Sequence, residues 1–504
     1  MVLSMFGTIY ILIPKALGMS MLGLNWALLT FSLSAKESSF FFILVLVSLS
    51  VFAWARYYML FNENPSFFFV SLLMFVLSMF LLVLSNSFLS VFLGWEGLGV
   101  TSFLLIVFYQ NWSSTGGGLL TLLTNRLGDA FLMVGFGIWM MHSTAWTLVG
   151  GSLLSFSLLV ALSFTKSAQW PFTSWLPAAM AAPTPVSALV HSSTLVTAGV
   201  WLLVRFSSLS NLSVSLLLLF SGATIFVASL AALLEMDAKK IVALSTLSQL
   251  GLMMLSLAVG GLSVCLFHLL SHALAKANLF MTVGMVLHMF FSQQNKRAMN
   301  MTNKVVILSA TLSILSLSGL GVLVGTFSKE EILKGHLGSV SSLLSVSFLA
   351  MVISLTMAYC YKLIVSMLTI NLNMHNSWNV SKSGTSPLLI MSLLLMGFSM
   401  VLMDNMDYCF ATLSVSTLYT LFLILFPVFM ALINVMSGGF YLNEKLTKSS
   451  SMMLLWMKKN LLLFNPLTSD SLHLMSVFLM KGDSFLFTKV LFSFMILMTA
   501  LLLL

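Results

Sequence analysis

The chain has 504 residues, of which 59% are hydrophobic and only 7% are charged, and its formal net charge is +9. A soluble domain carries roughly a quarter charged residues, so this composition excludes a soluble protein and indicates one that lies mostly inside a lipid bilayer. Apolar runs of about 18 residues or more recur along the whole length, which predicts an all-α, polytopic membrane protein and excludes a β-barrel.

The apolar runs predict about fifteen transmembrane helices, and the first two, over roughly 1–18 and 38–61, belong to an N-terminal unit, residues 1–65. A first set of five helices fills residues 66–206 and is expected at 66–84, 87–109, 117–141, 151–178 and 186–206. A second set of five fills residues 212–370 and is expected at 212–234, 240–259, 262–291, 305–330 and 341–370. In each set the fourth apolar run ends at a lysine, which predicts two inverted five-helix repeats with broken helices, as in transporters.

The rest of the chain is expected to add two transmembrane helices within residues 386–436, near 386–403 and 411–436. The segment 444–482 carries charged residues among short apolar runs, which is typical of an amphipathic helix that lies along the protein or the membrane interface. A last transmembrane anchor is expected at 485–504.

The basic residues of the loops predict an orientation. One side of the membrane receives most of them: Lys239, Lys240, Lys296, Arg297, Lys304, Lys382, Lys445 and Lys448. The other side receives only Lys36, Arg205 and Lys334. The positive-inside rule places the richer side, together with the N-terminus and 444–482, toward the cytoplasm or the mitochondrial matrix.

The stretch from Lys166 to Arg205 contains the clearest irregularity in the sequence. An apolar run reaches Lys166, and four prolines follow at Pro171, Pro177, Pro183 and Pro185. Proline removes a backbone donor and clashes with the preceding turn, so the helix should break near Pro171. A charged residue beside a broken helix at membrane depth indicates a functional site, although a lysine at a helix end can also simply reach the interface.

Ionisable residues inside the other runs need an explanation, because a charge at the bilayer centre costs about 2.5–3.5 kcal/mol on insertion scales. Glu96 lies in the sequence GWEGLG, whose small residues allow a neighbouring helix to approach closely. Arg126 and Asp129 lie three residues apart on one helix face, where they either belong to a site or neutralise each other as a local ion pair.

A column of ionisable side chains is predicted in the sequence FHLLSHALAK. His268, His272 and Lys276 are spaced four and four residues apart, so they lie on one face of a helix. Histidine changes its charge near neutral pH and a desolvated lysine can lose its proton, so this column can pass protons within the membrane. A single buried histidine is more often a satisfied core residue, but three ionisable groups in a column favour a functional role.

Two charged groups stand at the ends of apolar runs. Lys239 and Lys240 follow Glu235 and Asp237, and this group is expected to lie in a solvated loop. Lys329 ends a run of the second set, with two glutamates directly after it, and is expected to act as a proton carrier or, alternatively, to reach the interface as a helix-end lysine.

Other chemistries fit the sequence poorly. His268 and His272 have the spacing HxxxH, but no glutamate follows His268, so the zinc-protease pattern is absent. The three cysteines form no CxxC pair, which disfavours a disulfide framework and an iron–sulfur cluster. Haem ligation by histidines is disfavoured, although four are available: His191, His268, His272 and His288. We therefore expect no cofactor or metal bound by this chain and no contact with nucleic acid.

Several motifs occur together in an order that resembles a known family. They are GWEGLG with Glu96, NRLGD with Asp129, TKSAQWPFTSWLPAAM with Lys166, APTPVSALVHSST with His191, EMDAKKIVALSTLSQLG, FHLLSHALAKANLF and GTFSKEEIL. Over roughly residues 38–370 the sequence is similar to the antiporter-like subunits of mitochondrial NADH:ubiquinone oxidoreductase (respiratory complex I), and within them to the chain 5 type. The large subunits of Na⁺/H⁺ antiporters are relatives that share most of these motifs.

The resemblance implies roles for single residues. Glu96 and Lys166 would form a coupling pair, and His191 would connect the two halves. Lys276 would be the central lysine, with His268 and His272 beside it, while Lys329 would lie toward the exit. Asp129 and Asp237 match carboxylates of the family and would support the translocation of protons. Ala182 stands where the family usually has a glycine.

The resemblance also implies a setting. The chain would be a translocase subunit of the mitochondrial inner membrane, coupled to electron transfer from NADH to ubiquinone. FMN and the iron–sulfur clusters would belong to partner subunits, and the neighbours would be other membrane-arm subunits, notably chain 4, with accessory subunits and lipids such as cardiolipin. The alternatives are a Na⁺/H⁺ antiporter subunit and a structural membrane scaffold.

Overall fold

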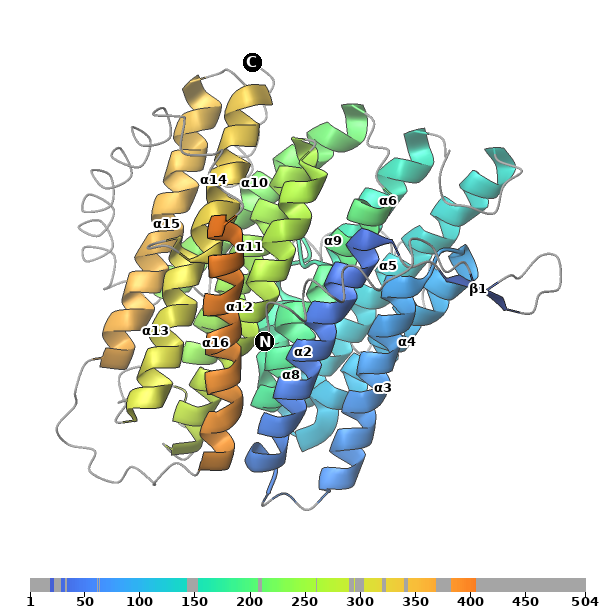
Figure 1. Cartoon of the computed structure of the whole chain (residues 1–504). Helices are drawn as coiled ribbons and strands as arrows, with labels where there is room; N and C mark the ends of the chain where they lie inside the picture. Colours follow the sequence, from blue (N-terminus) through green and yellow to red (C-terminus); the bar gives the residue numbers. More distant parts are fainter. Residues whose placement is uncertain are drawn as a thin grey trace, which may run out of the picture.

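The structure is a computed structural model, and it describes residues 19–21, 29–31, 34–60, 62, 64–142, 153–206, 211–259, 261–289, 294, 303–319, 323–339, 343–368 and 382–404. In this part the chain is a bundle of helices, which confirms the predicted all-α class (Figure 1). The described residues add two short strands, β1 (Met19–Met21) and β2 (Leu29–Phe31), which pair antiparallel near the N-terminus. The predicted segments 1–18, 411–436, 444–482 and 485–504 lie outside the described residues.

Most of the helices are long, apolar and unbroken. The first group comprises α2 (Ala35–Tyr58), α3 (Pro65–Leu84), α4 (Phe88–Ile106) with the short η1 (Val107–Tyr109), and α5 (Trp112–His142). The second comprises α10 (Asn211–Leu234), α11 (Ala238–Ala258), α12 (Leu262–Met289), α15 (Leu343–Leu368) and α16 (Lys382–Asp404). Within the described ranges, eight helical stretches are long and apolar enough to cross a membrane. This confirms a multi-pass membrane fold, while the total of fifteen spans stays a prediction.

The first broken helix lies where the sequence predicts it. The helix α6 (Leu153–Lys166) ends at the lysine, and a turn that contains Pro171 leads to α7 (Trp175–Ala178) and η2 (Ala179–Ala181). The next helix contains a π-helical turn, since α8 (Thr184–Leu189) continues through η3 (Val190–Thr194) into α9 (Leu195–Arg205).

A second break was not expected at its position. The sequence predicts one helix over 305–330, but the structure has α13 (Lys304–Ser318) and α14 (Val324–Ser339) with a break between them. Gly319 ends α13 with a left-handed φ of 79°, a conformation that glycine adopts without steric cost. Lys329 therefore lies inside the helix that follows the break, whereas Lys166 ends the helix that precedes one.

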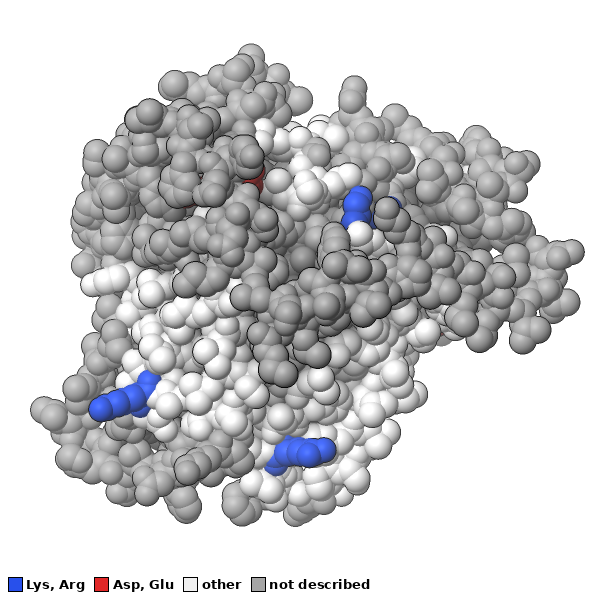
Figure 2. Space-filling model, viewed as in Figure 1, with Lys and Arg blue, Asp and Glu red and all other residues white. Residues whose placement is uncertain are grey.

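The helices run along a common direction, and α12 lies among the other helices of the bundle (Figure 1). The core helix α11 is buried at every residue except Lys240 in its first turn. By contrast, α3 to α5 expose large apolar side chains, among them Leu73, Leu93 and Leu123. On the face shown in Figure 2, the few described charged residues lie toward the two ends and the described surface between them is uncharged, as a bilayer requires.

Candidate functional site

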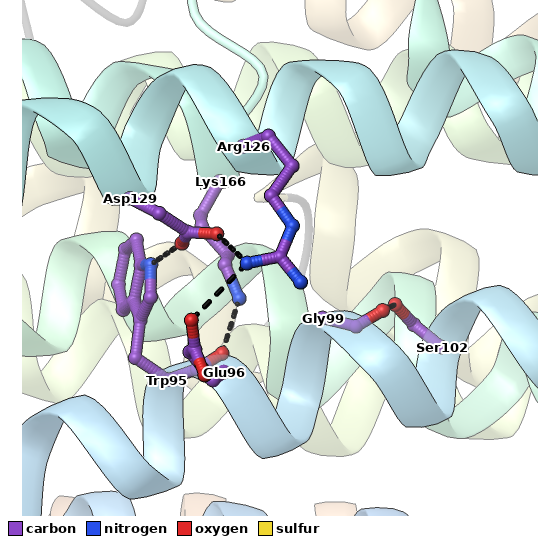
Figure 3. Close-up of polar contacts among 7 residues, drawn as sticks. All are labelled: Trp95, Glu96, Gly99, Ser102, Arg126, Asp129 and Lys166. Carbon is purple, nitrogen blue, oxygen red and sulfur yellow. Dashed lines mark hydrogen bonds and ion pairs between the residues drawn. The ribbon is translucent and has the colours of Figure 1, made fainter.

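The first polar cluster lies between α4, α5 and α6 (Figure 3). Arg126 bridges two carboxylates: its Nη1 lies 3.1 Å from Oε1 of Glu96 and 3.2 Å from Oδ2 of Asp129. Asp129 also accepts a hydrogen bond of 2.9 Å from the indole N–H of Trp95. The side chains of Arg126 and Glu96 are 53% and 37% exposed, although both lie on helices that are apolar enough to span a bilayer. The ion pair between Arg126 and Asp129 forms, as one of the two alternatives from the sequence predicts. Glu96 also pairs with the same guanidinium group.

Lys166 lies next to this cluster and is fully buried. Its Nζ donates a 2.9 Å hydrogen bond to the backbone carbonyl of Trp95 and lies 4.4 Å from the centre of the Trp95 ring (Figure 3). Glu96, its expected coupling partner, pairs directly with Arg126, and among the described contacts no ion pair joins Glu96 to Lys166. Its side chain is enclosed by the bundle and does not reach the surface of the described residues.

The glycines of GWEGLG explain why this cluster can form. A Cβ atom on Gly94 would lie 2.8 Å from the backbone nitrogen of Leu82, and one on Gly97 would lie 2.9 Å from Cβ of Ser78. Both contacts are with α3, so the small residues allow α3 and α4 to approach closely, as the sequence predicts. The opposite side of α4 is thereby turned toward α5 and α6.

His191 lies in the π-helical turn η3 and is fully buried. Its ring centre is 6.1 Å from that of Trp175, and neither ring nitrogen has a hydrogen-bond partner within the part of the chain that is described. The turn lies against α12, which carries the second group of ionisable residues. Buried polar atoms without partners are rare in proteins.

The predicted column on α12 exists, and its three members have different surroundings. His268 is held at both nitrogens, with Nδ1 2.8 Å from Ser328 Oγ and Nε2 3.2 Å from Gln249 Oε1. His272 is buried with no partner for either nitrogen among the described residues. Lys276 is fully buried and donates a 2.6 Å hydrogen bond to Ser245 Oγ.

Lys329 reaches back across the second helix break. Its Nζ donates to the carbonyls of Leu317 and Ser318 at 2.6 and 3.1 Å and to Thr356 Oγ1 at 3.1 Å. The last carbonyls of a helix have no partner within the helix and carry partial negative charge, so the ammonium group caps α13. The partners of this buried lysine among the described residues are thus neutral oxygens.

The group at the start of α11 differs from its prediction. Asp237 precedes the helix and pairs with Lys240 at 2.7 Å, with both side chains partly exposed, so this part agrees with a solvated loop. Lys239, however, is buried and donates a 3.2 Å hydrogen bond to the carbonyl of Ala182. The prediction of a solvated loop is therefore wrong for Lys239, while Asp237 lies at the N-terminus of α11.

The buried lysines share one chemical feature. The Nζ atoms of Lys166, Lys239, Lys276 and Lys329 all donate to backbone carbonyls or hydroxyl groups. Such oxygens accept hydrogen bonds without supplying a full counter-charge, so the charge of each lysine responds strongly to charges elsewhere in the bundle. A series of this kind is suited to taking up and releasing protons.

Several polar residues of the site were not singled out from the sequence. Gln249 and Tyr359 connect α11 to α15 through a 2.9 Å hydrogen bond, and Thr356 lies beside Lys329. A signal for part of this group exists, because Ser245, Ser248 and Gln249 recur at helical spacing in an otherwise apolar run. Within the described residues, no group of three or more His, Cys, Asp or Glu side chains is arranged to hold a metal ion.

Comparison with known proteins gives consistent findings. Residues 85–358 match the family described as NADH:quinone oxidoreductase/Mrp antiporter, TM. NADH-ubiquinone oxidoreductase chain 5 of Artemia franciscana is 44% identical over 293 residues, which cover 57% of this chain and 54% of that protein. Its counterpart from Anopheles arabiensis is 43% identical over 313 residues, which cover 58% of this chain and 79% of that protein. The match thus spans a little over half the length of the Artemia relative.

Among solved structures, a chain in the Mrp complex from Dietzia sp. DQ12-45-1b superimposes with a TM-score of 0.77 at 23% identity. The superposition covers 94% of this chain and 58% of that chain. At this level of identity the likeness shows a common fold and no more.

Proposed function

Because this chain belongs to the NADH:quinone oxidoreductase/Mrp antiporter membrane family, we propose that it is a proton-translocating subunit of NADH:ubiquinone oxidoreductase, respiratory complex I. Its place would be the mitochondrial inner membrane, with the basic ends of its helices toward the matrix. Electrons would pass from NADH to ubiquinone through FMN and iron–sulfur clusters held by partner subunits. This chain would contribute the movement of protons.

One observation carries this proposal, namely the lysines that are buried among membrane helices and that make no ion pair with a carboxylate within the described part of the chain. Lys166, Lys276 and Lys329 are each at most 5% exposed. Keeping an ammonium group in such a place costs free energy, so a structural scaffold would gain stability by replacing it with an apolar residue. The retention of three such groups in one bundle favours a role in proton transfer over a scaffold.

The residues then take the following proposed roles. Glu96, with Asp129 and Arg126 beside it, sets the local field at Lys166, which accepts and releases a proton. His191, which is buried in the π-helical turn η3 beside α12, would link this half to the column of His268, His272 and Lys276. Lys329 would release the proton on the far side. Asp237 would support this path from the start of α11 by holding Lys240.

A Na⁺/H⁺ antiporter subunit is the alternative, since the family includes both kinds of protein. The two differ in their partners, because only the respiratory complex contains NADH-oxidising, flavin and iron–sulfur subunits. Identification of the proteins that co-purify with this chain would decide between them.

The exposed part of the first cluster supports a neighbour at the face of α4 and α5. Glu96 and Arg126 are partly exposed near the middle of helices that otherwise present leucine and valine to their surroundings. Charges in contact with lipid tails are costly, so we propose that another membrane-arm subunit, such as chain 4, covers them. Accessory subunits and cardiolipin would occupy other parts of the surface.

The test of the function is the variant Lys166→Ala in the assembled complex. Loss of the ammonium group should abolish proton pumping driven by NADH oxidation, while the complex still assembles. Lys36→Ala is the matched control, because Lys36 is exposed in the first turn of α2. Normal proton-to-electron ratios in Lys166→Ala would refute the proposal.

A further inference from the structure

The hydrogen bonds around His268 form a chain whose direction can be worked out atom by atom. The hydroxyl of Ser248 donates to the carbonyl of Ser245 at 3.0 Å, so its only proton is already used. Ser248 Oγ also lies 3.1 Å from the Tyr359 hydroxyl and, while its own hydrogen stays on the Ser245 carbonyl, it accepts the Tyr359 proton. The Tyr359 oxygen in turn accepts from Gln249 Nε2 at 2.9 Å.

The hydrogen bonds that run from Gln249 through Tyr359 to Ser248 set the orientation of the Gln249 amide. With its NH₂ group directed at Tyr359, the amide turns Oε1 toward His268, 3.2 Å from Nε2. A carbonyl oxygen only accepts, so the imidazole must carry a hydrogen at Nε2 in both its neutral and its charged form. Only Nδ1 is then left to gain or lose a proton.

The partner of Nδ1 is suited to both protonation states. Ser328 Oγ lies 2.8 Å from Nδ1 of His268 and 3.1 Å from the carbonyl of Gly325. When His268 is neutral, the serine hydroxyl donates to Nδ1. When His268 is charged, Nδ1–H donates to Ser328 Oγ and the hydroxyl turns toward Gly325. Rotation of one hydroxyl group thus satisfies both states, and no heavy atom has to move.

We propose that Gln249 and Tyr359 act as positioning residues that fix the tautomer of His268, so that this histidine exchanges protons only at Nδ1, through Ser328, on the side of Lys329. The inference rests on the proposed function, because it assigns a direction to the proposed proton path. In the exchange, the N–H bond at Nδ1 forms as the O–H bond of Ser328 breaks. In the same step Ser328 Oγ takes a proton from the next carrier, an ammonium group such as Lys329 or a protonated water molecule, so no serine alkoxide forms.

His272, one turn further along α12, provides the contrast. Neither of its nitrogens has a partner among the described residues, so no neighbouring side chain fixes its tautomer. The two histidines of the column therefore differ: His268 has one defined exchange site, whereas His272 can exchange at either nitrogen.

The tautomer of His268 can be measured directly. The infrared spectrum of the purified complex with isotope-labelled histidine, minus that of the His268→Gln variant, contains the bands of this residue. We expect bands of the neutral Nε2–H form, and the Nδ1–H form in the wild-type complex would overturn the inference. This measurement needs no variant of Gln249 or Tyr359 to fold.

The variant Tyr359→Phe tests the role of Gln249 and Tyr359 as positioning residues, because it removes only the hydroxyl group and leaves His268 unchanged. Loss of one hydrogen bond should lower the preference for the Nε2–H form by roughly fivefold and slow proton translocation by a similar factor. Tyr361→Phe is the matched control, since Tyr361 lies on the same helix but is exposed. Unchanged bands and unchanged translocation in Tyr359→Phe would overturn the inference.

Substitutions at Ser328 complete the test. Ser328→Ala should slow translocation, whereas Ser328→Thr, which keeps a hydroxyl group, should restore it. Equal rates in both variants would overturn the route through Ser328. If His268→Gln itself pumped normally, the proposed function of the column would fail, and this outcome is distinct from a failure of the tautomer assignment.

Discussion

At the scale of the residue, the main finding is that neutral oxygens hold the buried lysines. Lys329 is the best example, since two helix-end carbonyls and one hydroxyl accept its hydrogens. An ammonium group in such surroundings is stabilised by hydrogen bonds but is not neutralised, so its proton can leave when a nearby charge changes.

The variant Lys329→Arg tests whether the loss of this proton matters. Arginine keeps its charge under all physiological conditions, so it can cap α13 but cannot release a proton. We expect proton translocation to fall at least about tenfold, as for the loss of a general acid or base, with assembly largely preserved. The proton-to-electron ratio is the measurement, and Lys304→Arg, at the exposed start of α13, is the control. Normal pumping in Lys329→Arg would make the lysine a structural cap only.

A second residue-scale prediction concerns a buried ion pair. Arg205 lies 2.9 Å from Glu37, with both side chains less than a tenth exposed, and its guanidinium also donates to the carbonyl of Val83. It therefore ties α9 to the start of α2 and the end of α3. Arg205→Ala should destabilise this corner by about 3–5 kcal/mol, because Glu37 is left buried without its counter-charge.

Thermal inactivation of the complex measures this loss of stability. The double variant Glu37→Leu with Arg205→Leu should be less damaging than Arg205→Ala alone, since it removes both charges. A larger loss in the double variant would show that the pair contributes through packing and not through its charges.

The sequence predicts many of these residues but not their partners. Charge at membrane depth identifies Lys166, Lys276 and the histidine column without any structure. It cannot show that Arg126 takes the carboxylate of Glu96, because that contact joins two helices whose rotation depends on the close approach of α3 and α4. The role of Tyr359 could not be predicted for the same reason. A tyrosine in an apolar run does not show that it will bind a glutamine 110 positions away.

At the scale of the element, the two helix breaks show what local sequence can and cannot predict. Pro171 is a strong signal, and α6 ends before it. The second break has no proline, and the serines and glycines around Gly319 are common inside membrane helices. The prediction of one helix over 305–330 therefore failed at Gly319, and with it the position expected for Lys329.

Gly325 offers a test of how closely α13 and α14 pack beside this break. A Cβ atom on Gly325 would collide with the backbone carbonyl of Ser316, and backbone cannot move aside as a flexible side chain can. Gly325→Ala should therefore separate the two helices and cost about 1–3 kcal/mol, the usual effect of overpacking. Lowered thermal stability, together with slower translocation, is the expected result.

Gly335→Ala is the matched control on the same helix. The nearest atom to its added Cβ would be a methyl carbon of Val259 at 4.0 Å, an ordinary contact. Alanine favours a helix by about 1 kcal/mol over glycine, so this variant should be neutral or slightly stabilising. Equal losses in the two variants would mean that the contact with Ser316 does not decide stability here.

At the scale of the whole molecule, a further prediction concerns the segment 444–482. Its charges among short apolar runs favour a helix that lies parallel to the membrane on the matrix side and bridges neighbouring subunits. A structure of the assembled complex is the test. A segment that crosses the bilayer would contradict both this prediction and the orientation derived from the loop charges.

The partly exposed Glu96 and Arg126 have a consequence for the life of the protein before assembly. A newly inserted copy without a neighbour would present these charges to lipid tails near the middle of the bilayer. If a neighbouring subunit covers this face, as proposed, an unassembled copy would differ from an assembled one in the exposure of these charges, and membrane proteases that recognise such charges would degrade it. Turnover of the chain would then follow the supply of that neighbour.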